Sequence, residues 1–106
     1  MADIRPYLER VRERFSDPKL QDSFKTLTML FEFPDTQQNF ALAMIEGNVT
    51  LEERNAENPD VRITIGTDTL AGIMDHKVNP ITAYMTRKLK VQGAQQNLVK
   101  LQKLLL

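Results

Sequence analysis

The residues of this chain that could serve as nucleophiles or general bases are few and far apart. There is no cysteine, and the single histidine, His76, directly follows Asp75. Both serines, Ser16 and Ser23, belong to the N-terminal region, far in sequence from that pair. A Ser-His-Asp arrangement therefore has little support. We expect His76 to lie at the surface near a helix end, where the helix dipole favours a cationic imidazole, and we expect no enzymatic activity.

The acidic residues do not form a metal-binding pattern either. Glu52 and Glu53 are neighbours on a predicted strand, where successive side chains point to opposite faces of the sheet. Glu57 and Asp60 follow in a predicted turn. Since no thiolate ligand is available, we expect neither a metal nor an organic cofactor.

The charges are balanced in number but not in position. The chain has 14 basic and 14 acidic residues, which argues against a nucleic-acid binder that depends on neutralising phosphates. The stretch from His76 to Leu106 has no acid, whereas Glu32 to Asp75 is rich in acids. One interpretation is two solvated faces of opposite sign. The other is that the basic end meets an anionic head group or membrane surface, through Arg87, Lys88, Lys90, Lys100 and Lys103.

The elements that must position these residues begin with an amphipathic helix. Its apolar positions recur at helical spacing, from Ile4 to Phe15, with Asp3 as the expected N-cap. Residues 16–18 end it, and a short second helical turn is expected through Leu20 and Phe24. Apolar residues then alternate in four segments, 27–33, 40–45, 49–51 and 61–65. Short turns separate these segments, including one at Gly47-Asn48, so we predict an antiparallel meander of four strands.

Helical spacing returns after Gly66. Thr67 or Asp68 is expected to cap a helix through Met74, and Asn79-Pro80 is a strong second start signal. A fifth short strand at 89–91 and a last helix at 94–106 follow. The sequence predicts a single α+β domain over residues 1–106, with a five-stranded, mostly antiparallel sheet covered on one face by helices.

Several segments between Asp60 and Leu105, taken in order, resemble the sterol carrier protein type 2 family. In that family a strand leads into a helix, followed by an asparagine-proline helix start and a turn with an aromatic residue. A lysine-leucine-lysine strand ending in glycine and a leucine-rich last helix complete the pattern. The corresponding segments here are Val61–Ile65, Leu70–Met74, Val78–Pro80, Ala83–Met85, Lys88–Gly93 and Leu98–Gln102.

The resemblance implies a hydrophobic tunnel between the sheet and the helices. Members of the family bind and exchange sterols, fatty acids, fatty acyl-CoA or phospholipids without a metal or a catalytic residue. The implied partner is therefore a long-chain or sterol-like lipid, with transient membrane contact. The expected lining residues are Met29, Phe31, Phe40, Leu42, Met44, Ile63, Ile65, Leu70, Ile73, Met74, Ile81, Tyr84, Met85, Leu98, Leu101 and Leu105.

The same apolar residues could instead form an ordinary close-packed core. The domain would then act as an interaction or homodimerisation module. If a ligand binds, energetics favour a long one, because a buried methylene contributes about 0.8 kcal/mol and association costs on the order of 4–15 kcal/mol. The last helix is the expected lid, with Leu104–Leu106 either gating the site or fraying.

The expected location is the cytoplasm. The N-terminus carries Asp3, Arg5 and Glu9, so it has no apolar signal-peptide core. No stretch reaches the length of about 18 apolar residues that spans a bilayer. The final residues, Leu104–Leu106, lack the targeting tripeptide of the family's peroxisomal members.

Overall fold

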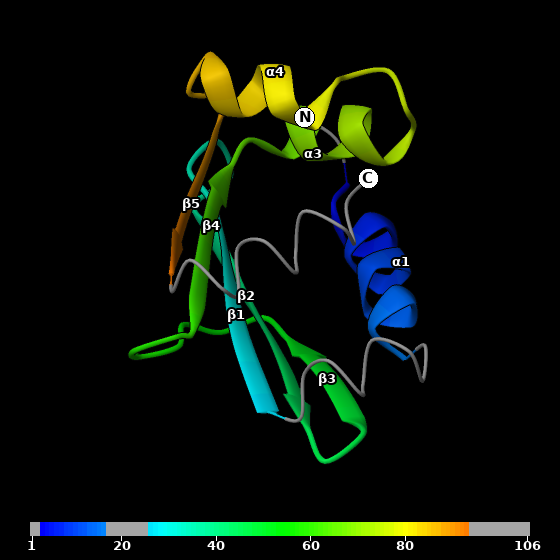
Figure 1. Cartoon of the computed structure of the whole chain (residues 1–106), viewed down its shortest axis with the longest axis vertical. Coiled ribbons are helices and arrows are strands. Elements are labelled where there is room, and N and C mark those ends of the chain that lie inside the picture. Colours follow the sequence, from blue (N-terminus) through cyan, green and yellow to red (C-terminus); the bar gives the residue numbers. More distant parts are fainter. Residues whose placement is uncertain (1–2, 17–25, 94–106) are drawn as a thin grey trace.

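The architecture is α+β, as predicted. The computed structural model describes residues 3–16 and 26–93, and its five strands form one sheet in the order β3-β2-β1-β4-β5 (Figure 1). The elements in chain order are α1 (Arg5–Phe15), β1 (Thr26–Phe33), β2 (Gln38–Ile45), β3 (Asn48–Glu52), β4 (Val61–Ile65), α3 (Thr67–Met74), α4 (Pro80–Met85) and β5 (Leu89–Gly93).

The sheet is mixed, and here the predicted meander is wrong. β1 pairs with β2, β2 with β3 and β4 with β5 in antiparallel fashion, but β4 lies parallel to β1 on its other side. The connection between β3 and β4, residues 53–60, has eight residues and is long enough for the chain to cross β2 and β1 before β4 begins. In that position Val61, Ile63 and Ile65 are all buried beside the central strand, which a place next to the edge strand β3 would not provide.

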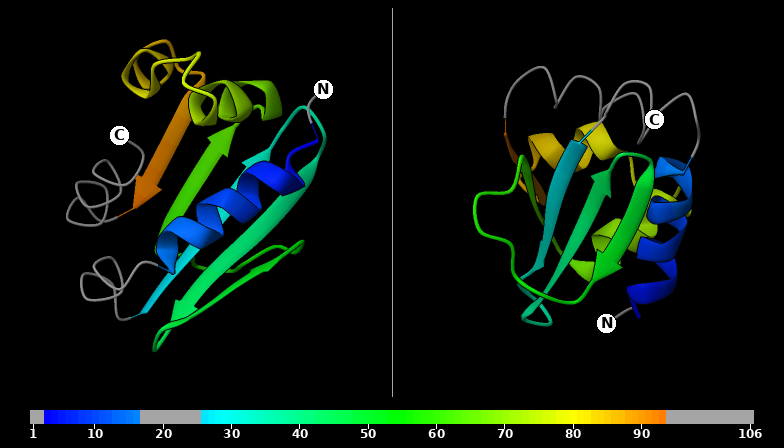
Figure 2. Two further views of the ribbon diagram at one scale, coloured as in Figure 1. Left: turned by 90° about the vertical axis from the view of Figure 1, so that its right-hand side faces the viewer. Right: turned by 90° about the horizontal axis from the view of Figure 1, so that it is seen from below.

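The helices cover one face of the sheet, which we call the inner face. Figure 2 (left) shows α1 lying across it, and α3 and α4 close one end of the sheet beyond β4 and β5. α1 packs against β3 and α3 and buries Leu8, Val11 and Phe15. This arrangement follows from helical spacing, because an amphipathic helix hides its apolar stripe against another layer.

The other face of the sheet is more polar and is partly covered by the connection between β3 and β4. Ala56 of this connection packs on Leu30 and Ala41. The Asp60 carboxylate accepts a hydrogen bond of 2.8 Å from the backbone N–H of Thr28, which ties the connection to β1. Among the described residues, the helices and the larger apolar cluster therefore lie on the inner face.

The predicted start of α4 is confirmed, and that of α1 differs by one residue. Asn79 caps α4 as expected, and its side-chain oxygen accepts hydrogen bonds from Ile81 N–H (2.8 Å) and Thr82 N–H (3.4 Å). α1 begins one residue later than expected, at Arg5, although Asp3 still accepts a hydrogen bond from its backbone N–H. Helix ends commonly differ by a residue or two in this way.

The start of α3 was predicted wrongly. Neither Thr67 nor Asp68 is the N-cap, which is Gly66, and no side chain at the cap itself makes the capping bond. Asp35, from the turn after β1, supplies the acceptor instead. A capping group 32 residues away in sequence leaves no local signal.

The β2–β3 hairpin turns one residue earlier than predicted. Ile45 pairs with Asn48, so Glu46 and Gly47 form the two-residue connection. Both have positive φ, 50° and 86°, as the favoured hairpin turn requires.

Two predicted elements, the turn through Leu20 and Phe24 and the helix at 94–106, lie outside the described residues. Each helix in residues 3–16 and 26–93 is too short or too polar to cross a membrane.

Candidate functional site

The candidate site is the apolar layer between the inner sheet face and the helices. The sheet contributes alternate residues of its three central strands, and the register places Met29 opposite Leu42 and Phe31 opposite both Phe40 and Ile63. The Phe31 and Phe33 rings stack with centroids 6.5 Å apart, and Phe33 meets Phe40 edge-on at 5.9 Å. The three rings therefore form one aromatic group within the layer.

The helices complete the layer from the opposite side. α3 contributes Leu70, Ile73 and Met74, which belong to the same continuous cluster as the strand residues. α4 contributes Ala83, which is 1% exposed. The only buried polar or charged residue among those described is Thr67, at the start of α3. The layer can therefore bury apolar matter, but its described side chains carry no group suited to proton transfer.

The nearest carboxylates are held at the rim by hydrogen bonds. Thr67 donates its hydroxyl to Asp35, and this bond lowers the pKa of Asp35 below its ordinary value. Tyr7 of α1 donates its hydroxyl to Asp75 at 2.8 Å, which likewise lowers the pKa of Asp75 and raises that of Tyr7. Arg10 adds an ion pair of 3.4 Å to Asp75. These groups join elements to each other and do not face a shared reaction site.

Ten of the predicted lining residues are buried together in this cluster. None is more than 6% exposed, so the sequence pattern identified a single apolar layer. Whether these residues contact a ligand is a separate matter and stays a prediction. They are Met29, Phe31, Phe40, Leu42, Met44, Ile63, Ile65, Leu70, Ile73 and Met74.

The three predicted lining residues on α4 lie outside the buried cluster. Ile81, Tyr84 and Met85 are 48%, 58% and 76% exposed, and the helix faces the core through Ala83 instead. A six-residue helix across the end of the sheet can turn only one narrow side inward. At about 100° per residue, Ile81 and Met85 point almost directly away from Ala83.

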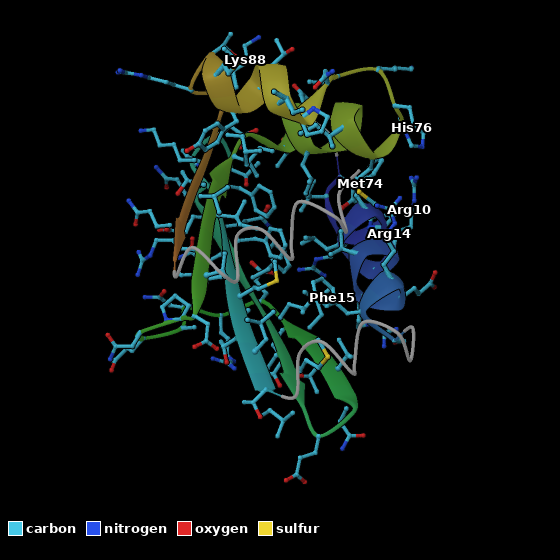
Figure 3. All side chains as sticks on the ribbon, viewed as in Figure 1. Arg10, Arg14, Phe15, Met74, His76 and Lys88 are labelled. Carbon is cyan, nitrogen blue, oxygen red and sulfur yellow. The ribbon has the colours of Figure 1, made fainter. Side chains whose placement is uncertain are left out.

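The predicted cations fall into two groups. Arg87, Lys88 and Lys90 are exposed, and Figure 3 shows Lys88 at the α4 end of the molecule. Lys100 and Lys103, with the predicted lining residues Leu98, Leu101 and Leu105, lie outside the described residues.

Sequence reasoning left α1 out of the candidate site. Leu8, Val11 and Phe15 belong to the cluster, and their helical spacing was visible in the sequence. The missing information was the surface on which that stripe packs, because periodicity identifies an apolar face but not its partner. Within the described ranges there is no group of three or more His, Cys, Asp or Glu residues that could hold a metal ion.

The described residues thus form a small α+β domain whose helices enclose one apolar layer against a mixed five-stranded sheet. A sequence model of the SCP-2 sterol transfer family matches residues 8–106. The chain belongs to this family, and the resemblance inferred from its sequence is confirmed.

Solved structures share the fold. Sterol carrier protein domain 2 of Helicoverpa armigera is 20% identical, with a TM-score of 0.73 over 96% of this chain and 84% of that one. Palmitated SCP2L2 from Aedes aegypti is 15% identical, with a TM-score of 0.73 over 98% and 95% of the two chains. At such identities the likeness shows the fold.

A larger protein contains the same fold as one part. The inverting sec-alkylsulfatase Pisa1 from Pseudomonas sp. is 24% identical, with a TM-score of 0.63 over 76% of this chain. The match covers only 12% of the sulfatase, so this chain corresponds to a small part of that enzyme. A comparison with curated protein sequences found no match.

Proposed function

We propose that this chain binds one long-chain lipid in the apolar layer between the inner sheet face and the helices, and carries it between membranes. The observation that carries the proposal is the composition of that layer, which is apolar throughout the described residues except for Thr67. Membership of the SCP-2 sterol transfer family supports it, as does a structural neighbour solved in palmitated form.

The side chains of the layer suit a flexible apolar ligand. Met29, Met44 and Met74 all belong to it, and unbranched, polarisable thioethers adapt readily to different shapes. A chain of about sixteen carbons would contribute roughly 12 kcal/mol before the cost of association, on the order of 4–15 kcal/mol, is subtracted. A short acid would not offset that cost. The proposed ligand is therefore long and apolar.

An acidic head group would meet cations at the surface. Arg87, Lys88 and Lys90 are exposed on or beside β5, and no acid occurs between His76 and Gly93. Lys100 and Lys103 remain candidates from the sequence. Charge reversal at Lys88 and Lys90 should weaken the binding of a fatty acid relative to the matching fatty alcohol. Equal effects on the two ligands would remove the head-group assignment.

The test of the proposal is native mass spectrometry of the freshly purified protein, followed by solvent extraction and identification of what is released. We expect a one-to-one adduct with the mass of a long-chain lipid, or stoichiometric uptake of added palmitate, acyl-CoA or sterol. A bare protein that takes up none of these would mean that the layer is a filled core. An interaction or dimerisation module would then be the better explanation.

A further inference from the structure

Among the described residues, the exposed large apolar side chains gather at the end of the molecule formed by α4. Four large apolar residues are exposed among those described, and three of them, Ile81, Tyr84 and Met85, are on this six-residue helix. Helical geometry places Ile81 and Met85 almost opposite the buried Ala83, with Tyr84 beside them at about 100° from Ala83. They form a compact apolar patch, which we call the α4 patch. Figure 1 shows α4 at the extreme end of the fold, past the ends of β4 and β5.

Positive charge flanks the α4 patch on both sides in the chain. Lys77 precedes the helix, and Arg87 and Lys88 follow it, all three exposed. No acidic residue occurs between His76 and Gly93, and within the described part of the chain Arg87 and Lys88 form no ion pair. The nearest acid before this stretch is Asp75, which is occupied by Tyr7 and Arg10 and also faces Lys77.

The other candidate surfaces lack this combination. α1 is amphipathic, but its apolar stripe is buried in the core, and its outer side carries paired charges such as Glu9 with Arg12. Among the described residues the fourth exposed large apolar side chain is Ile45, at the end of β2 beside Glu46. Figure 1 shows the β2–β3 hairpin at the end of the molecule opposite α4.

We propose that the α4 patch and its flanking cations dock this protein on anionic lipid bilayers. Apolar side chains with a tyrosine suit the boundary between head groups and acyl chains. Lysine and arginine at its edge are attracted to the negative potential of an anionic membrane surface. An anionic bilayer would repel acidic side chains beside the patch, so the lack of acids on both sides of it favours a bilayer. A protein partner places no such condition on the flanking residues.

Docking at this end would also bring the apolar layer to the membrane. Ala83 on the inner side of α4 belongs to the same cluster as the proposed lipid site, while the patch lies on the outer side of the same helix. A role of this docking in lipid transfer rests on the proposed function. Binding to the bilayer can be measured independently of lipid uptake.

The experiment is co-sedimentation of the full chain with vesicles of phosphatidylcholine alone and with about a third phosphatidylserine. We expect the wild type to bind the anionic vesicles, to lose binding in high salt and to ignore the neutral ones. The triple variant I81S/Y84S/M85S and the double variant R87E/K88E should each bind at least about tenfold more weakly. Matched controls are I45S, which removes an exposed apolar residue elsewhere, and R54E, which reverses a cation elsewhere; both should bind like the wild type.

Folding and lipid uptake are measured in parallel on every variant, by urea unfolding and by a fluorescent fatty acid added without vesicles. Unchanged vesicle binding by both patch variants would overturn the inference, as would a wild type that ignores anionic vesicles. A wild type that binds anionic vesicles through the patch but takes up no fatty acid would retain the docking surface and reject the proposed lipid site.

Discussion

The carboxylate of Asp35, in the turn after β1, accepts hydrogen bonds from both the backbone N–H and the hydroxyl of Thr67, the first residue of α3. The distances are 3.1 Å from the nitrogen and 2.5 Å from the hydroxyl oxygen. Thr67 is fully buried, so these donors have no access to water. The contact fixes α3 against the sheet at one rim of the apolar layer.

Removing this acceptor should destabilise the protein. In Asp35→Ala the two donors of Thr67 lose their partner, and loss of a capping acceptor of this kind costs about 1–2 kcal/mol. Asp35→Asn retains an oxygen acceptor and should lose less. Urea unfolding followed by circular dichroism measures the difference, and an alanine variant as stable as the wild type would show that the contact contributes nothing.

The same contact predicts how stability depends on pH. Hydrogen bonding to Thr67 lowers the pKa of Asp35 in the folded state, so the unfolded chain takes up a proton first as the pH falls. The stability that the Asp35 carboxylate contributes is complete above the unfolded pKa of about 3.9. It is lost as the pH falls through the lower pKa of Asp35 in the folded state.

We therefore expect Asp35→Asn to lose less unfolding free energy than the wild type between about pH 6 and about pH 3. Asp75, whose pKa is also lowered, should leave a residual pH dependence in this variant. Identical pH profiles for the two proteins would rule out a contribution from Asp35.

Gly72 in α3 is required by a close neighbour. A β-carbon added there would lie 2.5 Å from Cγ2 of Val78, so Gly72→Ala should be destabilising by about 1–3 kcal/mol despite the better helix propensity of alanine. In a Val78→Ala background, which removes Cγ2 and leaves the Cβ at 3.3 Å, the same substitution should cost much less. The double-mutant cycle in urea tests this, and additive effects would show that the two side chains do not meet.

Met44 and Ile45 distinguish a lipid site from a filled core, because these neighbours point to opposite faces of β2. Met44 is fully buried in the inner layer, whereas Ile45 is 53% exposed. If the layer admits a lipid, Met44→Phe should reduce fatty-acid affinity with little loss of stability. In a filled core it should cost about 1–3 kcal/mol by overpacking. Ile45→Phe is the control and should change neither quantity; titration with a fluorescent fatty acid and urea unfolding report them.

Fatty-acid affinity should rise with chain length. Each added methylene that enters the layer contributes about 0.8 kcal/mol, roughly a fourfold change in Kd. Competition of saturated acids from decanoate to palmitate against a bound probe would measure the slope. Affinity independent of chain length would mean that the acyl chain is not buried.

The sequence by itself determined the type and face of most elements. Alternation placed Met29, Phe31 and Ile63 on one side of their strands, and the asparagine-proline pair at 79–80 marked the start of α4. The order and spacing of the segments after Asp60 were sufficient to identify the family. These features are local, because backbone periodicity and caps depend on residues a few positions apart.

Only the tertiary structure decided the arrangement of these elements. It placed β4 parallel to β1 instead of next to β3, gave α3 its cap from Asp35 and turned Ile81, Tyr84 and Met85 outward. An apolar pattern shows that a face prefers burial, but a short helix buries only the side that meets a neighbour. Which side meets one depends on contacts between segments far apart in the chain, and no local pattern records them.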